Sequence, residues 1–165
     1  MPQVITRDFG ELECDPSAIL EFPHGLPGFE TERRFVLIER GPLAPAVFLQ
    51  SLETPEVCFL TIPVSIVDPD YQIGITAEDV DVLGIELASG IEWEREILSL
   101  AILAGSAEGV TANLLAPIFV NPKTRVGVQA VRADQKYSHR HPLRPAPRDP
   151  DAKPEGASPG EAECL

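Results

Sequence analysis

Proline and glycine interrupt the hydrophobic segments of this sequence so often that long helices are disfavoured. The 165 residues include 17 prolines and 12 glycines. Proline disrupts a helix interior because it lacks the N–H donor, and glycine supports tight turns. Short apolar runs between such residues are typical of strands separated by turns. We therefore expect a mainly β, single-domain fold, a β-roll or barrel-like structure with one or two short helices.

Strands are expected wherever a short hydrophobic run falls between turn signals. They cover residues 4–9, 12–14, 18–22, 35–39, 47–52, 57–62, 96–104, 118–121 and 126–132. The clearest helix signal is Thr76 ahead of Val80 and Leu83, because a threonine hydroxyl can cap the free amides of a helix start. Gly84 follows and suits the left-handed position that ends a helix. We expect about two turns of helix, packed on the sheet.

Residues 144–165 differ in composition from the rest of the chain. Six prolines lie between positions 142 and 159, with no aromatic residue among them. Such a segment cannot bury enough apolar surface to offset the entropy lost on folding. The sequence therefore predicts a folded domain over residues 1–143 and a proline-rich, disordered, acidic tail over residues 144–165.

The three cysteines give no sign of a disulfide framework. Cys14, Cys58 and Cys164 are an odd number without Cys-x-x-Cys spacing, which also argues against a thiolate metal cluster. We expect Cys14 and Cys58 to be buried free thiols and Cys164 to be exposed. The sequence shows neither a secretory signal nor an apolar run long enough to span a bilayer, so a cytoplasmic location is expected.

Charge is distributed unevenly along the chain. Residues 1–117 carry 20 acidic and 5 basic side chains, whereas residues 118–142 carry five basic and one acidic. A predominantly anionic body repels nucleic acid and anionic lipid and attracts basic partners. The simpler explanation is that the negative charge keeps the protein soluble.

No arrangement of residues points to catalysis, to a cofactor or to a bound metal. Nucleophilic and phosphate-binding motifs are absent, and the histidines are His24, His139 and His141. His139 and His141 would share one face of a strand, but a third ligand of matching spacing is missing. A hydrolase would need a pocket that gathers His24 or His141 with carboxylates.

The basic segment over residues 123–140 supports an alternative function. Its cations are Lys123, Arg125, Arg132, Lys136 and Arg140, with Tyr137 among them. Cations interleaved with an aromatic ring are typical of nucleic-acid-binding surfaces. A small β-barrel nucleic-acid-binding protein is therefore the second hypothesis, and it requires these cations on one open face.

Residues 22–30 read as a rigid, packed loop. Two prolines fix their φ angles, two glycines can turn left-handed, and Phe22 and Phe29 anchor the ends. Gly28 is expected to hold a positive φ between Pro27 and Phe29.

Several further short segments are more specific than generic loops and strands require. In order along the chain, the specific segments are Phe9-Gly10, Phe22-Pro23, Gly25-Leu26-Pro27-Gly28-Phe29-Glu30, Phe35, Leu49-Gln50-Ser51, Asp68 with Tyr71, Asn113-Leu114, Ala116-Pro117-Ile118, Asn121, Tyr137-Ser138 and Arg140-His141-Pro142-Leu143. In these residues, their order and their spacing, the sequence resembles the FliW family of flagellar assembly factors. The resemblance extends over about residues 3–143, and the tail beyond Leu143 departs from the compact family pattern.

The resemblance implies a small, non-enzymatic, cytoplasmic protein that is monomeric when free. It implies two competing partners, the CsrA-type RNA-binding translational repressor and flagellin, with no direct contact to nucleic acid or membrane. When flagellin is exported, the freed protein would capture CsrA and relieve repression of flagellin synthesis. Whether it would imitate RNA or act from a separate surface stays open, although the family favours the second route.

Six polar or amphipathic residues of the matching segments are the candidate partner-binding residues. For each of them a structural role is at least an equal alternative: for example, Asn113 and Asn121 can satisfy turn backbone, and Tyr137 can close the core with its hydroxyl in water. The candidates are Asp68, Tyr71, Asn113, Asn121, Tyr137 and Arg140.

Overall fold

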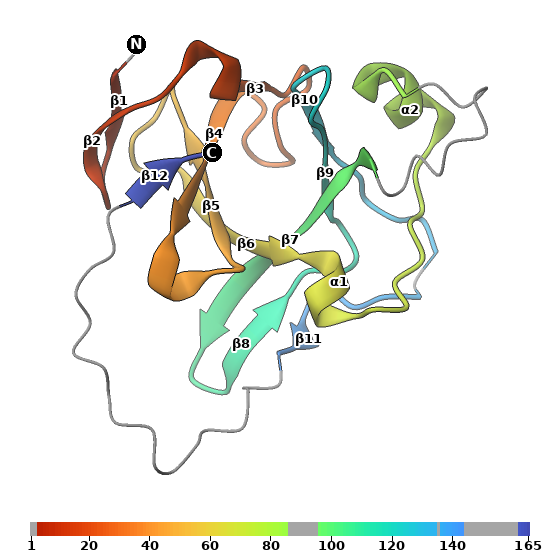
Figure 1. Ribbon diagram of the computed structural model, residues 1–165. Helices are drawn as coiled ribbons and strands as arrows, with labels where there is room; N and C mark the ends of the chain where they lie inside the picture. The colour runs from red at the N-terminus through yellow and green to blue at the C-terminus, as the bar shows by residue number, and fades with distance from the viewer. Residues whose placement is uncertain (1–2, 86–95, 135, 144–161) are drawn as a thin grey trace.

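The computed structural model describes residues 3–85, 96–134, 136–143 and 162–165. Within these residues, seven strands close into a barrel in the order β7-β6-β5-β4-β3-β10-β9, because β9 pairs back onto β7 (Figure 1). Neighbouring strands are antiparallel except β3 and β10. The barrel strands are β3 (Leu20–Glu21), β4 (Arg34–Arg40), β5 (Val47–Ser51), β6 (Cys58–Pro63), β7 (Leu98–Ser106), β9 (Ile118–Asn121) and β10 (Val126–Gln129).

The remaining strands extend or cover this barrel. β1 (Gln3–Thr6) and β2 (Gly10–Glu13) form a separate hairpin, and β8 (Gly109–Ala112) joins β7. β11 (His141–Pro142) then joins β8. The predicted mainly β, barrel-like fold is confirmed, and each predicted strand overlaps an observed one. β8 and β11 were not predicted, because their short sequences carry too little apolar pattern.

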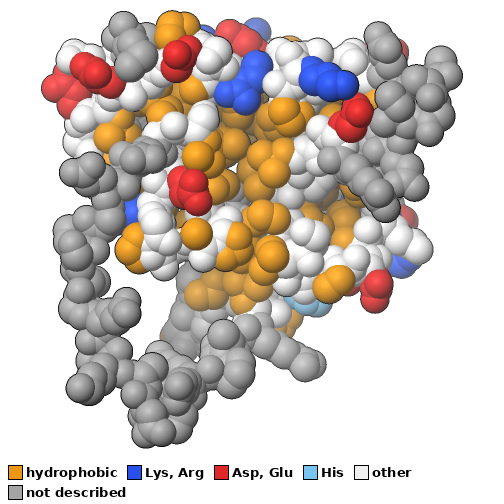
Figure 2. Space-filling model, in the orientation of Figure 1, with side chains coloured by type: hydrophobic (Ala, Val, Ile, Leu, Met, Phe, Trp, Pro, Cys, Tyr) orange, Lys and Arg blue, Asp and Glu red, His pale blue; other side chains and the backbone are white. Residues whose placement is uncertain are grey.

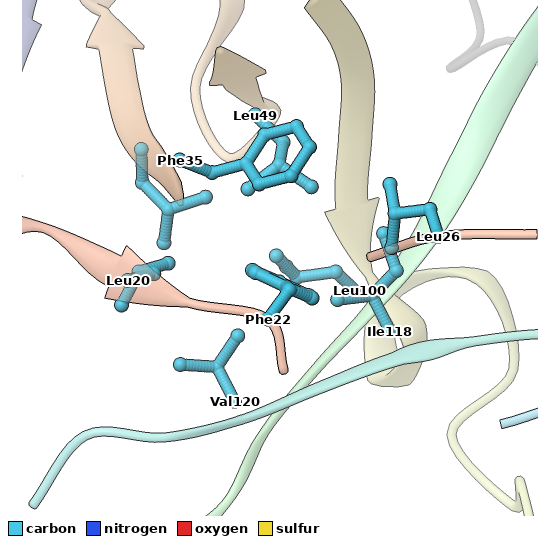
Figure 3. Close-up of a cluster of buried hydrophobic side chains, with 9 residues drawn as sticks. Leu20, Phe22, Leu26, Phe35, Leu49, Leu100, Ile118 and Val120 are labelled. Carbon is cyan, nitrogen blue, oxygen red and sulfur yellow. The ribbon is translucent and has the colours of Figure 1, made fainter. Parts of the chain in front are cut away.

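The barrel interior holds one hydrophobic cluster to which nearly every barrel strand contributes (Figure 3). Alternation along β4 sends Phe35 and Leu37 into this cluster, while Val36 and Ile38 face the opposite side. That outer side is covered by the β1–β2 hairpin, so all four residues are buried. Burial on both faces explains why β4 reads as a continuous apolar run. The cluster consists of Leu20, Phe22, Leu26, Phe35, Leu37, Leu49, Leu100, Ile118 and Val120.

The predicted helix is α2 (Ala77–Leu83), and its two end signals are confirmed. The Thr76 hydroxyl accepts a hydrogen bond from the Asp79 N–H at 3.1 Å, and Gly84 ends the helix with a φ of 68°. Leu83 packs with Phe119 against the outer side of the barrel. A further short helix, α1 (Val64–Val67), was not predicted because its β-branched residues favour strands. Two 3₁₀ turns are η1 (Pro16–Ala18) and η2 (Gly41–Leu43).

The loop over residues 22–30 is packed against the barrel, as expected, and it leads to Glu32. Gly28 has the predicted positive φ, at 84°. Gly25 is more constrained, because its φ is 62° and a Cβ there would lie 2.6 Å from the Phe29 carbonyl oxygen. Leu26 fills the barrel core, and the buried Glu32 carboxylate accepts hydrogen bonds from the hydroxyls of Ser51 and Thr54.

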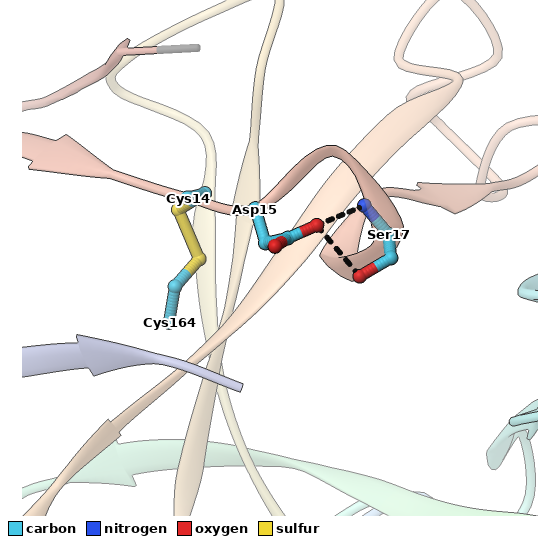
Figure 4. The surroundings of a disulfide bond; sticks show 4 residues. All are labelled: Cys14, Asp15, Ser17 and Cys164. Carbon is cyan, nitrogen blue, oxygen red and sulfur yellow. Dashed lines mark hydrogen bonds between the residues drawn. A yellow bond between two sulfur atoms is a disulfide. The ribbon is translucent and has the colours of Figure 1, made fainter. Parts of the chain in front are cut away.

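The expectations for the cysteines and for the end of the tail need correction. Cys14 and Cys164 form a disulfide, and Cys58 is the free thiol (Figure 4). A strand, β12 (Ala162–Cys164), pairs with β4. No spacing pattern pointed to this disulfide, because the paired cysteines are 150 positions apart. Residues 162–165 therefore join the fold, residues 144–161 lie outside the described part, and the domain boundary at residue 143 stays a prediction.

Among the described helices, none has the length and apolar character required to cross a membrane.

Candidate functional site

Two loops meet beside β8 and β11, and they bring most of the candidate residues together. The first, residues 68–75, follows α1, and the second, residues 130–140, follows β10. Asp68 starts the first loop: its carboxylate accepts the Asp70 N–H at 2.9 Å, and its carbonyl accepts the Tyr71 N–H at 3.1 Å. The Asp-Pro-Asp sequence therefore forms a turn, and this turn positions Tyr71.

Tyr71 and Tyr137 join the two loops. Their ring centroids are 4.3 Å apart, with the planes tilted by 38°. The Tyr71 hydroxyl donates to the Leu114 carbonyl at 2.8 Å, and the Tyr137 hydroxyl accepts the Gln72 N–H at 2.9 Å. Both rings are half-buried. The pair therefore presents one side to solvent while each hydroxyl is held by backbone.

Arg132 packs against both tyrosine rings. Its guanidinium carbon lies 5.5 Å from the Tyr71 centroid and 4.9 Å from the Tyr137 centroid, within the range of cation–π attraction. It also donates two hydrogen bonds of 2.8 Å to the Asp134 carboxylate and one to the Gln72 carbonyl. We refer to Tyr71, Gln72, Arg132, Asp134 and Tyr137 as the tyrosine–arginine cluster.

The charges of this cluster stabilise one another. The hydrogen bonds from Arg132 hold the pKa of the Asp134 carboxyl below its ordinary value. Burial raises the pKa of the Tyr71 hydroxyl, an effect that the nearby Arg132 charge partly opposes. At neutral pH the cluster therefore contains the Arg132–Asp134 ion pair beside the uncharged phenol of Tyr71. Lys136 adds a second cation, whose ammonium lies 5.8 Å from the Tyr137 ring centroid and donates to the Gln72 side chain.

A shallow groove of about 220 Å³ adjoins the cluster. Its walls come from α1, the first loop and the start of β7, and Asp68 and Tyr71 both line it. Ile73 lines it as well. The groove thus combines a carboxylate, an aromatic ring and aliphatic carbon, a mixture of polar and apolar groups that also occurs at protein interfaces.

Asn113 and Asn121 have the backbone roles that the sequence left open. The Asn113 carboxamide oxygen accepts the N–H groups of Leu115 and Ala116 at 3.1 and 3.0 Å. Asn121 is buried on the other side of the barrel, where it accepts the Lys123 N–H and donates to the Leu83 carbonyl at the end of α2. Asn113 therefore lies beside the cluster, through its neighbour Leu114, and Asn121 lies apart from it.

Arg140 lies at the margin of the same surface. It is exposed immediately before β11, and its N–H donates to the Ser138 hydroxyl at 3.0 Å. His139 is exposed and His141 is half-buried. In the described part of the chain, no group of three or more histidine, cysteine, aspartate or glutamate side chains is placed to hold a metal ion. Burial raises the pKa of the Cys58 thiol to about 11, so it is a thiol and not a nucleophilic thiolate at neutral pH.

The cations of residues 123–140 do not form one open stripe. Lys123 pairs with Glu96 at 3.3 Å, and the Arg125 side chain donates to the Ser17 carbonyl at 2.7 Å. Arg132 is packed inside the cluster, with its side chain only 6% exposed. Separate elements therefore engage these cations, which counts against the nucleic-acid hypothesis.

Sequence reasoning missed three members of the cluster, namely Gln72, Arg132 and Asp134. Arg132 was noticed only as one cation among five, because its burial between two rings depends on the folded loops. One available signal was the spacing Arg132-x-Asp134 together with a nearby tyrosine, since arginine commonly pairs bidentately with a carboxylate and stacks on aromatic rings.

The face of the molecule that is turned to the viewer in Figure 1 is also partly apolar. Figure 2 shows hydrophobic side chains gathered over the middle of the face seen in Figure 1, with acidic side chains spaced around them. Phe29 of the rigid loop is 40% exposed and contacts Phe59 edge-to-face at a centroid distance of 5.2 Å.

Comparison with known proteins gives consistent matches. The family model described as FliW protein matches residues 3–143. The flagellar assembly factor FliW of Heliobacterium modesticaldum is 32% identical over 154 residues, which is 93% of this chain and 98% of the relative. That of Desulfitobacterium hafniense is 37% identical over 142 residues, covering 83% of this chain and 88% of the relative.

A solved structure shows the same fold. The crystal structure of the flagellar assembly factor FliW superposes with a TM-score of 0.77 at 30% sequence identity, covering 89% of this chain and all 100% of that chain. The family match includes the barrel, the rigid loop and the tyrosine–arginine cluster. The chain therefore belongs to the FliW family.

Proposed function

We propose that this protein is a non-catalytic cytoplasmic flagellar assembly factor that binds a CsrA-type repressor and flagellin in competition. While flagellin is abundant in the cell, it occupies the protein. When flagellin is exported, the freed protein binds the repressor and relieves repression of flagellin synthesis. The observation that carries this proposal is membership of the FliW family over residues 3–143, which spans the barrel and the candidate surface.

The charge of the chain supports a basic partner. The formal net charge is −13 at pH 7. A repressor that grips RNA is basic at its RNA-binding surface, so opposite charges speed the encounter of the two proteins. The same charge disfavours direct binding of nucleic acid by this protein.

The tyrosine–arginine cluster and the adjoining groove support a binding surface on this side of the barrel. Tyrosine and arginine are enriched among the residues that dominate interface energetics. Asp68, Tyr71, Tyr137 and Arg140 are the proposed contacts, because each is at least partly exposed on this surface. Asn113 and Asn121, both sequence candidates, are proposed to act by holding backbone rather than by touching a partner.

Competition is tested by titrating flagellin into a preformed complex with the CsrA-type repressor. We expect flagellin to release the repressor, with each partner weakening the other by the same factor, as linkage requires. Association with the repressor should slow as salt rises, since exposed charges are screened over about 10 Å at 0.1 M salt. A ternary complex in which neither affinity falls would contradict the proposal.

The surface is tested by matched charge reversals. Arg140→Glu should change the affinity for at least one partner by about ten-fold or more, because it reverses a charge within the proposed contact area. Arg33→Glu makes the same change at an exposed arginine beside β4 and should leave both affinities within about two-fold. Equal effects of the two variants would mean that only net charge matters. A gel-shift titration with RNA tests the alternative function, because a nucleic-acid-binding protein would shift the RNA.

A further inference from the structure

Two strands, β3 and β12, pair along the same edge of β4. β3 covers only Arg34 and Phe35, and β12 continues along the same edge beside Ile38, Glu39 and Arg40. The Leu165 N–H extends this pairing by donating to the Leu37 carbonyl at 2.8 Å. In Figure 1, β12 accordingly lies against β4 at the margin of the barrel. Without β12, the edge from Leu37 to Arg40 would expose unpaired backbone donors and acceptors, which are a template for another strand.

The disulfide is what holds β12 there. β12 is three residues long, and its register places Glu163 opposite Glu39. So short a strand gains little stability from its own backbone bonds. Cys164 joins the hydrophobic cluster under the β1–β2 hairpin and is bonded to Cys14, at a Cα–Cα distance of 5.6 Å.

The two sulfur atoms differ in accessibility. Cys14 is fully buried, whereas Cys164 is partly exposed. A dithiol reductant can therefore attack the Cys164 sulfur as a thiolate, and the Cys14 sulfur leaves and takes up a proton. The second thiol of the reductant then displaces Cys164, so that two electrons and two protons pass to the protein and the reductant becomes a disulfide. The products are a buried Cys14 thiol and a Cys164 thiol on a released strand.

We propose that the Cys14–Cys164 disulfide is a redox latch that decides what occupies the edge of β4. In the oxidised protein the chain's own C-terminal strand occupies it. In the reduced protein the edge accepts an extended segment of a partner polypeptide that carries a basic residue opposite Glu39. A basic residue at that register position faces the Glu39 carboxylate, and opposite charges across an antiparallel pair attract. This regulation is independent of which proteins the tyrosine–arginine cluster binds.

The latch is tested by amide hydrogen exchange on the full chain, oxidised and reduced. Reduction should speed exchange of the Leu37 and Glu39 amides by about ten-fold or more, because these N–H groups point to the edge that β12 covers. Exchange in β6, which β12 does not touch, should stay the same. Cys164→Ser should exchange like the reduced protein in either condition, and Cys58→Ser should keep the redox response. Thiol alkylation of the oxidised protein should label Cys58 alone.

The docking site is tested with two peptides and nuclear magnetic resonance of the labelled full chain. Both peptides copy residues 160–165 with serine in place of Cys164, and one also carries lysine in place of Glu163. The lysine peptide should shift the amide signals of residues 37–40 in the reduced chain and bind about two- to five-fold tighter than the glutamate peptide. Glu39→Lys should reverse that preference.

Three outcomes would overturn the proposal. Labelling of all three cysteines in the oxidised protein would remove the latch. Equal exchange of the Leu37 and Glu39 amides with and without reductant would show that the disulfide does not hold β12. Peptide-induced shifts that are absent from the reduced chain, or equal in both redox states, would show that the edge is not a redox-gated docking site.

Discussion

β11 and β12 both add to the barrel sheet from the C-terminal part of the chain, but different bonds hold them. β11 is anchored by many weak contacts: backbone pairing with β8, the tyrosine–arginine cluster, and Tyr137 and Leu143 packed against Leu114. β12 is anchored by backbone pairing with β4 and one covalent bond, Cys14–Cys164. The first region lies within the family match at residues 3–143, and the second lies beyond it.

This difference explains why the β11 region responds to the loss of single contacts and the β12 region responds to redox conditions. Contacts of the β11 kind are spread over several residues, so removing one of them weakens the region by degrees. The β12 attachment depends on one bond whose existence is set by redox conditions, so it is either present or absent. Gradual weakening suits a binding surface, and an attachment that is either present or absent suits a switch.

The largest effect should come from breaking the covalent attachment. Cys164→Ser should lower the free energy of unfolding by about 2–4 kcal/mol, because the disulfide closes a loop over almost the whole chain and so restricts the unfolded state. Urea denaturation with and without reductant measures this, and the variant should no longer respond to reductant. Cys58→Ser is the matched control that keeps the response. Unchanged stability of oxidised and reduced wild type would contradict the assignment.

A smaller loss is expected when the aromatic contact of the β11 region is removed. Tyr137→Ala should cost about 1–3 kcal/mol of folding free energy, since it removes a half-buried ring stacked on Tyr71 and leaves the Gln72 N–H without its acceptor. Tyr137→Phe keeps the ring and should cost about 1 kcal/mol or less. If both variants were equally destabilised in urea, the hydroxyl and not the stacking would hold the region.

A lysine in place of Arg132 tests how far the anchoring of the β11 region depends on the guanidinium group. Arg132→Lys should lower stability by about 1 kcal/mol, because a lysine cannot keep the bidentate bond to Asp134 and the contact with both rings. Thermal unfolding monitored through tyrosine fluorescence provides the measurement. Arg125→Lys, at a position with a single side-chain bond to the Ser17 carbonyl, is the matched control and should change less.

The smallest expected effect concerns the pKa values of two aspartates, one in each region, and their dependence on salt. Asp134 beside Arg132, and Asp15 beside the disulfide, both have a pKa below the ordinary value, Asp15 chiefly because the Ser17 N–H and hydroxyl donate to it (Figure 4). A lowered folded-state pKa contributes stability above the unfolded pKa of about 3.9, and that stability is lost as pH falls through the folded value.

The response of these two pKa values to salt should distinguish a charged partner from neutral hydrogen-bond donors. Raising salt should move the pKa of Asp134 toward its ordinary value, because a nearby cation is screened, and should move that of Asp15 less, because neutral donors are not. Carboxyl-carbon titrations by nuclear magnetic resonance measure both midpoints. Equal salt shifts at the two carboxyls would show that long-range charge, and not these local partners, sets both values.

Much of the barrel was predictable because its signals are local. The strand at residues 118–121 was predicted with its observed bounds, and Thr76 and Gly84 marked both ends of α2. These signals depend on neighbours in sequence, where alternation and capping act directly. Tyr71, Tyr137 and Asp68 were selected as candidates, and they do lie together, but their grouping came from the family resemblance and not from spacing.

The sequence by itself determined the β character of this protein, its short helix and the absence of a long apolar span, because residue type and spacing within a few positions decide those features. Only the tertiary structure decided that Arg132 is buried between Tyr71 and Tyr137, and that Cys14 meets Cys164. Both depend on segments that are far apart in the sequence: Tyr71 lies 61 positions before Arg132, and the two cysteines are 150 positions apart. No local pattern records such a meeting, because the distance between these residues is set by the closure of the barrel and by which of its edges the end of the chain covers.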